Sequence, residues 1–260
     1  MNGNMIRVIA LLEESGKEAL NKAAREAFGK TFASDITSIL NDLPNTTLSK
    51  SIGTFVSKFI QAFLQLFYDT ENKPRQIEEM VSALIREPLT TSLEQLRVAN
   101  KIVLFSEKSK QYKIERLRNA LYSLDRARSL ASEGFEIALI DLLRGLCTFE
   151  LPGATSETLI HFTAYQIWAH KEVEYLISVR KEKQQKAERL DAKIKELKYS
   201  LNLKMGNGPL YLALQQAQDR TQCLRSEIDE IILLEGKILD TIFYITALLE
   251  FVQKMMNGGA

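Results

Sequence analysis

The carboxyl-terminal part of the chain carries apolar residues at alternating steps of three and four along two long arms. The arms are separated by one glycine-rich turn, Met205-Gly206-Asn207-Gly208-Pro209. The stepped positions are Val173, Leu176, Arg180, Lys183, Ala187, Leu190, Ile194, Leu197 and Leu201, and then Leu210, Leu214, Ala217, Thr221, Leu224, Ile228, Ile231, Glu235, Ile238, Ile242, Ile245, Leu249, Val252 and Met256. A repeat that averages 3.5 residues keeps one apolar seam facing a partner helix. The sequence therefore predicts a long antiparallel coiled-coil hairpin.

Two polar positions of the seam, Arg180 and Glu235, are expected to meet. If Leu201 faces Leu210, the antiparallel register places them about one layer apart, and an ion pair between them is predicted. Such a pair would fix the register more than it would add stability, because removing two charges from water costs several kcal/mol that their attraction only partly returns.

The two arms carry opposite charge. Residues 171–204 contain ten basic and six acidic residues, a net charge of +4, whereas residues 209–250 contain three basic and seven acidic residues, a net charge of −4. The basic run comprises Arg180, Lys181, Lys183, Lys186, Arg189, Lys193, Lys195 and Lys198. It has the composition of a nucleic-acid or anionic-lipid footprint. We interpret it instead as a solvated face paired with the acidic second arm, so nucleic acid is a disfavoured partner.

The composition of the chain and its few helix-breaking residues predict an all-α fold. Only five prolines interrupt 260 residues, no alternating β pattern occurs, and the net charge is +1. The convincing boundary is Thr148 to Thr155, which contains Pro152-Gly153. We therefore expect a helical bundle over residues 1–150 and the hairpin over residues 156–257, with the base of the hairpin packed on the bundle. From Ser156 a helix is expected to run for about 49 residues at 1.5 Å each.

The amino-terminal half is predicted to be helical throughout. A short helix over Asp35 to Leu43 ends at Pro44, and a later helix is expected to break at Pro88. Between them lies the most apolar helix, with an aromatic ladder at steps of four: Phe55, Phe59, Phe63 and Phe67. The ladder fits a core helix of a bundle. The alternative is an interfacial membrane helix, but such helices usually carry more Lys and Arg on their polar face than the single Lys58 here.

The second arm changes character toward its end. Around Ile238 to Met256 extra apolar residues appear on other sides of the helix: Leu233, Leu234, Leu239, Phe243, Tyr244, Leu248 and Phe251. This part is expected to be core. Recognition by the hairpin is then expected near Gly206 or on the exposed flanks of the first arm.

Signals for chemistry are weak. Phe28-Gly29-Lys30-Thr31 resembles the end of a phosphate-binding loop, but Ala24 stands where its first glycine belongs. The two histidines, His161 and His170, are nine apart rather than at a helical metal-binding spacing. The sequence therefore predicts a protein that is not an enzyme, with no cofactor and no metal site.

Cysteine usage and hydropathy favour a cytoplasmic location. Cys147 and Cys223 are isolated and are expected to be reduced core thiols. No charged-then-apolar leader opens the sequence, and no run approaches the roughly 20 apolar residues needed to span a bilayer. Two cysteines alone leave secretion open.

Two function classes follow from this organisation. The first is an interaction or scaffold protein that presents the hairpin to a protein partner or to its own copy, as an oligomer. Its candidate residues are Arg180, Lys183, Lys186, Lys193, Gly206, Asn207 and Trp168. Trp168 shares a broad helix face with Phe162 and Tyr165, expected to be core or, if exposed, an anchor for a partner. The alternative is a membrane-active bundle that releases the Phe55, Phe59, Phe63 and Phe67 ladder onto lipid, in the manner of pore-forming or cell-death proteins.

Overall fold

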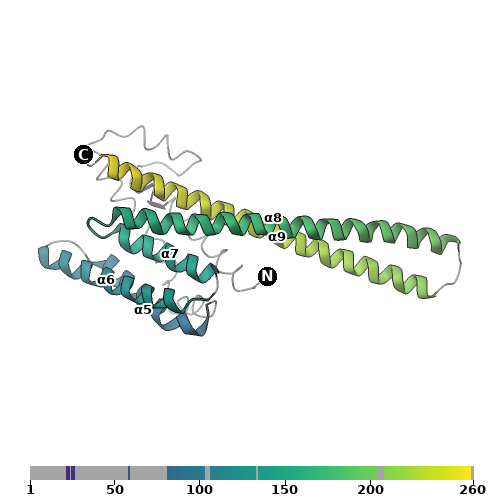
Figure 1. Cartoon of the computed structure of the whole chain (residues 1–260), viewed down its shortest axis with the longest axis horizontal. Helices are drawn as coiled ribbons and strands as arrows, with labels where there is room; N and C mark the ends of the chain where they lie inside the picture. Colours follow the sequence, from purple (N-terminus) through teal and green to yellow (C-terminus); the bar gives the residue numbers. More distant parts are fainter. Residues whose placement is uncertain are drawn as a thin grey trace. The chain divides into compact units, whose positions relative to one another are not determined.

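Five helices fall wholly within the residues that the computed structural model describes. Those residues are 22, 23, 25, 26, 58, 81–102, 106–132, 134–203 and 208–258. The helices are α5 (Ala83–Lys101), α6 (Glu107–Leu130), α7 (Gly134–Phe149), α8 (Thr155–Leu203) and α9 (Gly208–Gly258) (Figure 1). The described residues form no strand. The all-α prediction is confirmed.

Four sequence-based predictions fall outside the described residues. They are the phosphate-loop likeness at residues 28–31, the helix over residues 35–43, the phenylalanine ladder from Phe55 to Phe67, and the turn residues Gly206 and Asn207.

The chain divides into two compact units. One contains Met1–Ala169 and Asp240–Ala260, and the other contains His170–Leu239. Helices α8 and α9 therefore each contribute residues to both units.

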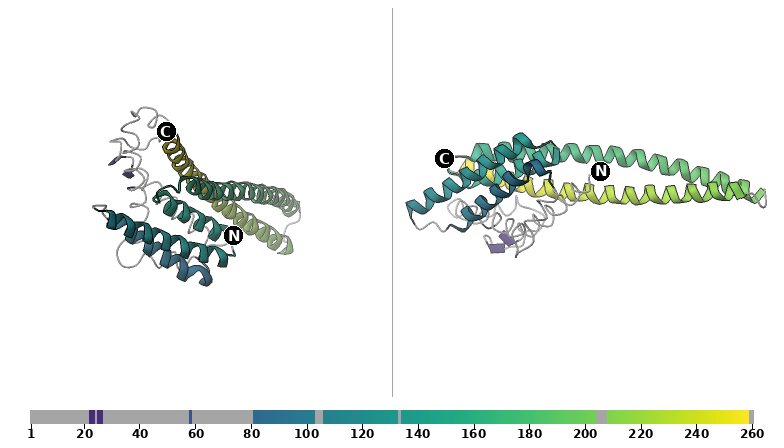
Figure 2. Two further views of the ribbon diagram at one scale, coloured as in Figure 1. Left: turned by 60° about the vertical axis from the view of Figure 1, so that its left-hand side comes forward. Right: turned by 90° about the horizontal axis from the view of Figure 1, so that it is seen from below.

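The second unit, His170–Leu239, is part of the antiparallel hairpin that the sequence predicts over residues 156–257. Its two arms run side by side in opposite directions in all three views (Figures 1 and 2). Leu176 and Ile231 are fully buried in the seam, at 0% and 1% exposure. Ile194 and Leu197, nearer the turn, are only half-buried. The seam is therefore less well covered toward the turn.

The first arm has the predicted length, since α8 is 49 residues long. It follows a turn over Leu151 to Ala154, in which the Ala154 N–H donates to the Leu151 carbonyl at 3.3 Å. Pro152 and Gly153 occupy the central positions, and Gly153 has a φ of 78°. A type II turn requires that positive φ at its third residue, so glycine is needed there.

In the first unit, α5, α6 and α7 are antiparallel neighbours in chain order. Helix α5 meets α6 through the 3.1 Å hydrogen bond from Arg116 to Gln95. Helix α6 meets α7 through Arg144, whose Nη2 lies 2.7 Å from the Asp125 carboxylate. Helix α7 is the most buried of the described helices, and its buried residues include Leu139, Ile140, Leu142, Leu143 and Leu146.

The prediction of a helix break at Pro88 is wrong. Helix α5 continues through it from Ala83 to Lys101, and Pro88 itself is buried. Proline removes one helical hydrogen bond, here to the carbonyl of Leu84, whose side chain is 65% exposed. The buried residues Ile85 and Leu89 lie on either side of the proline, and their packing holds the two parts in one helix.

A break that periodicity did not predict separates α5 from α6. Ser106 caps α6 by accepting from the Ser109 N–H at 3.2 Å, and the Ser109 hydroxyl accepts from the Ser106 N–H at 3.0 Å. This reciprocal pair satisfies two donors that a helix start leaves unpaired. The apolar spacing continues across the break and therefore does not reveal it.

Helices α7 and α8 approach closely in the first unit. A Cβ added at Gly145 would lie 2.4 Å from the Phe162 ring, and one at Gly134 would lie 3.2 Å from Nε1 of Trp168. Thr158 donates a 3.0 Å hydrogen bond to Thr148 along the same contact. Phe162 and Tyr165 are buried, as the sequence predicts for core residues.

The end of α9 is largely core, as predicted. From Thr241 onward the buried residues face several sides of the helix: Thr241, Ile242, Tyr244, Ile245, Ala247, Leu248, Leu249 and Val252. The prediction fails for Leu233, Leu239 and Phe243, which are 61%, 50% and 44% exposed. No described helix is long and apolar enough to cross a bilayer.

Candidate interaction surface on the helical hairpin

Three ion pairs join the two arms of the hairpin. Arg180 Nε lies 2.9 Å from Glu235 Oε1, and Arg225 Nη2 lies 2.8 Å from Asp191 Oδ2. Lys183 donates to Glu227 in the third pair. The predicted pairing of Arg180 with Glu235 is confirmed. The Asp191 pair has the reverse polarity, with its acid on the basic arm.

The Arg180 pair is half shielded from solvent. Its side chains are 28% exposed for Arg180 and 11% for Glu235. Although the two atoms are close, neither makes a hydrogen bond within the described structure, so the contact is electrostatic. Glu235 is the less exposed of the two, so its charge depends more on the partner to offset the cost of removing it from water.

The lysines at the middle of the first arm lower the pKa of neighbouring carboxyls. The hydrogen bond from Lys183 holds the pKa of Glu227 below its ordinary value, as does the bond from Lys186 for Glu182. Lys186 lies 2.5 Å from Glu182 on its own helix, so it does not connect the arms.

Beyond Lys186 the cations of the basic run make no ion pair within the described part of the chain. Four exposed cationic residues there form what we call the distal basic row, and none makes an ion pair with a described residue: Arg189, Lys193, Lys195 and Lys198. The expectation that the whole run is neutralised by the second arm is therefore wrong for this part. It holds for Arg180 and Lys183.

The reason lies in where the acids of the second arm fall. Asp191 meets Arg225, so the residues that follow Asp191 on α8 face residues that precede Arg225 on α9. Residues 208–218 contain no charged side chain, and Asp219 is the one acid of this arm that precedes Arg225. Asp219 makes no ion pair with a described residue. The acids Glu227, Asp229, Glu230 and Glu235 all follow Arg225. The net charges of the two arms balance, but their charged segments do not lie opposite each other.

The same structure reveals exposed apolar residues that the sequence assigned to the core or left out. Ile232 and Leu239 are 45% and 50% exposed, and Tyr211 is 60% exposed. Ile232 and Leu239 are seven residues apart, a spacing that returns to the same side of a coiled-coil helix. Gly236 lies between them, and a Cβ added there would have no neighbour within 4 Å. This side of α9 is open.

Trp168 belongs to the first unit rather than to this surface. Its ring is half-buried, packs at 5.9 Å from the Tyr165 ring and covers Gly134. The structure therefore places Trp168 at the contact between α7 and α8 in the first unit. Arg180, Lys183, Lys186 and Lys193 lie on α8 in the second unit.

Several polar side chains of the first unit are buried beside an oppositely charged partner. Asp141 lies 3.7 Å from Nδ1 of His161 and 3.8 Å from Arg144. Lys113 lies 2.5 Å from the nearly buried Glu150. Burial raises the pKa of the Cys147 thiol, and the Glu150 carboxylate raises it further. A thiol held protonated is a poor nucleophile. Cys223 is exposed, so its predicted place in the core is wrong.

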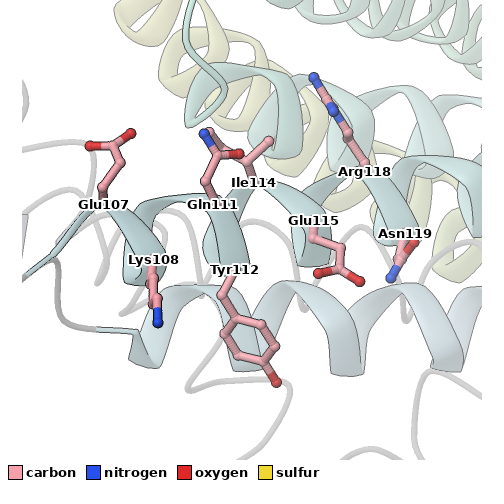
Figure 3. Close-up of a pocket in the computed structure, with 8 residues that line it drawn as sticks. All are labelled: Glu107, Lys108, Gln111, Tyr112, Ile114, Glu115, Arg118 and Asn119. Atoms are coloured by element: carbon pink, nitrogen blue, oxygen red, sulfur yellow. The ribbon is translucent and has the colours of Figure 1, made fainter.

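A hollow on α6 does not bring reactive side chains of different helices together. Its eight lining residues, from Glu107 to Asn119, all come from this one helix. Figure 3 shows Tyr112 and Lys108 pointing to one side of the helix and Gln111 and Arg118 to the other. No group of three or more metal-binding side chains occurs among the residues with described positions.

Comparisons of the chain with protein-family models, with curated proteins and with solved structures find no match.

Proposed function

We propose that the protein is a non-enzymatic interaction or scaffold protein whose helical hairpin binds a protein partner. The observation that carries the proposal is the distal basic row. Four exposed cations lie along this segment, and none of them makes an ion pair with a described residue. Like charges in a row repel, and an external acidic surface relieves that repulsion.

Exposed apolar residues on the same hairpin support a protein as the partner. Tyr211, Ile232 and Leu239 add exposed apolar area to the same hairpin. Protein interfaces combine apolar anchors with complementary charge, and tyrosine is enriched among the residues that dominate binding. Nucleic acid would use the cations but not the two aliphatic side chains.

Site-specific photo-crosslinking tests the proposal. A photo-reactive amino acid replaces Lys195 in the distal basic row of the full-length protein, and Glu115 on the exposed face of α6 serves as the matched control. In the native cells, we expect discrete protein adducts from position 195 and none from position 115. Adducts that mass spectrometry identifies as protein support the proposal.

The opposite outcomes are clear. Equal labelling from both positions, or no adduct from position 195, would contradict a binding role for the hairpin. If nuclease treatment removes the adducts, the partner is nucleic acid and not protein.

A further inference from the structure

We infer that the partner of the hairpin is a second copy of the same chain, packed antiparallel to the first along the side of the Asp191–Arg225 ion pair. The inference rests on the proposed function and names its partner. Its basis is the distribution of charge along the hairpin together with the exposed apolar residues on one side of it.

The hairpin is electrically polarised along its length. The segment nearer the turn, residues 189–226, contains seven basic and three acidic residues, a net charge of +4. The remaining segments of the second unit, residues 170–188 and 227–239, contain six basic and eight acidic residues, a net charge of −2. Two hairpins side by side in the same direction would place like charges together. In the antiparallel direction each positive segment meets a negative one.

One side of the hairpin carries this polarity on exposed residues. Residues seven apart share a position on a coiled-coil helix, and residues four apart are near neighbours on one side. Counting from Asp191 and Arg225 in these steps defines the pair side. Its exposed charged and apolar residues, besides Arg225, are Glu174, Lys181, Glu188, Lys195, Lys198, Tyr211, Asp229, Ile232 and Leu239. Three acids and one lysine of this set belong to the negative segments, whereas Lys195 and Lys198 belong to the positive one.

The exposed apolar residues of the pair side also lie in both segments, so that they can meet in an antiparallel pair. Ile232 and Leu239 belong to the negative segments of the pair side, and Tyr211 to the positive one. In an antiparallel pair related by a two-fold axis, every contact occurs twice. Tyr211 of each copy then approaches the aliphatic pair of the other, while Lys195 and Lys198 approach Asp229. Gly236 leaves room for close approach because it has no side chain.

A charge-swap mixing experiment tests the inference on the full-length chain. One variant carries Lys195→Glu and Lys198→Glu, and the other carries Glu174→Lys and Asp229→Lys. Light scattering coupled to size-exclusion chromatography at low salt should give the wild type twice the 29.5 kDa chain mass. Each variant alone should associate at least tenfold more weakly, because its hairpin now has one sign of charge at both ends of the pair side. An equimolar mixture should recover a heterodimer.

Apolar contact has its own matched pair of variants. Ile232→Ser removes an exposed side chain from the pair side and should weaken the dimer at least tenfold. Leu233→Ser removes one of similar exposure about a quarter turn away and should leave the dimer unchanged. Circular dichroism on every variant should show the helicity of the wild type, which separates weakened association from misfolding.

Three results would overturn the inference. They are a wild type that stays monomeric at every soluble concentration, charge variants that dimerise like the wild type, and a mixture that stays monomeric. The proposed function fails separately, since protein adducts at position 195 in cells together with a monomeric purified chain would mean a different protein partner. If Ile232→Ser and Leu233→Ser weaken the dimer equally, the interface does not lie on the pair side.

Discussion

Glu235 is the more deeply buried partner of its ion pair with Arg180, at 11% against 28% side-chain exposure, across a seam that is otherwise largely apolar. The two ends of this pair therefore respond differently to mutation. An arginine that loses its acid still reaches solvent through its long side chain. A short carboxylate in the seam does not.

The first prediction is an unequal mutant cycle. Glu235→Leu should leave the unfolding midpoint almost unchanged. Arg180→Leu should lower the unfolding free energy by about 1–3 kcal/mol, because it leaves a partly buried carboxylate unpaired. The double variant should regain most of that loss, since leucine continues the apolar seam. Urea unfolding followed by circular dichroism measures all three. Equal losses from the two single variants would contradict the unequal burial.

The second prediction concerns two helical glycines. Gly145→Ala should destabilise the first unit by about 1–3 kcal/mol, because its Cβ would overlap the buried Phe162 ring. Gly236→Ala has open space around it and should instead stabilise the protein by about 0.5–1 kcal/mol through helix propensity. Urea midpoints of the two variants should therefore move in opposite directions. A stabilised Gly145→Ala protein would mean that α7 and α8 are farther apart.

The third prediction separates the two thiols. Cys223 is exposed and should react readily with a maleimide at neutral pH. Cys147 is buried, and burial raises its pKa, so it should react only after unfolding. Mass spectrometry of the native protein should find one modification, and of the urea-unfolded protein two. The Cys223→Ser variant should take up none when native.

The fourth prediction is acid sensitivity of the hairpin. Lys183 lowers the pKa of Glu227 below 4.5 in the folded state. The pair therefore stabilises the folded protein above that pH, and the stabilisation is lost as the pH falls through the lowered pKa. Unfolding free energy should decline between about pH 5 and pH 3 less steeply in Glu227→Gln than in the wild type.

A control variant for this pH dependence lies on the same helix. Glu230→Gln changes an exposed carboxyl that has no ion pair with a described residue. Its pH profile should follow that of the wild type. If Glu230→Gln flattens the profile as much as Glu227→Gln, the Lys183 contact is not its source.

The hairpin was predictable because its signal is periodic and long. The stepping of apolar residues gave both arms, their antiparallel direction and the pairing of Arg180 with Glu235. Helix ends were less predictable where packing overrides local preference, as at Pro88, which is carried through α5 by the buried residues around it. The Ser106 and Ser109 cap has a recognisable sequence spacing, but the apolar pattern runs across it.

The candidate surface was predicted only in part. Summing charge over whole arms suggested complete neutralisation, whereas the acids are concentrated after Arg225 and the lysines continue past Asp191. Counting charge in shorter facing segments would have shown the mismatch. The exposure of Ile232 and Leu239 was not predictable in the same way, because a strongly apolar helix end suggests burial on all sides, and only the neighbouring helices decide which sides are covered.

The boundaries between the two units fall inside α8 and α9, after Ala169 and after Leu239, where the backbone is helical on both sides. Proteases cleave extended segments far more readily than intact helices, so limited digestion should not release the hairpin at these two positions. Any truncated version would also begin and end with severed helical turns whose backbone groups have lost their partners. The hairpin is thus a part of the protein to be altered by side-chain substitution and not by excision.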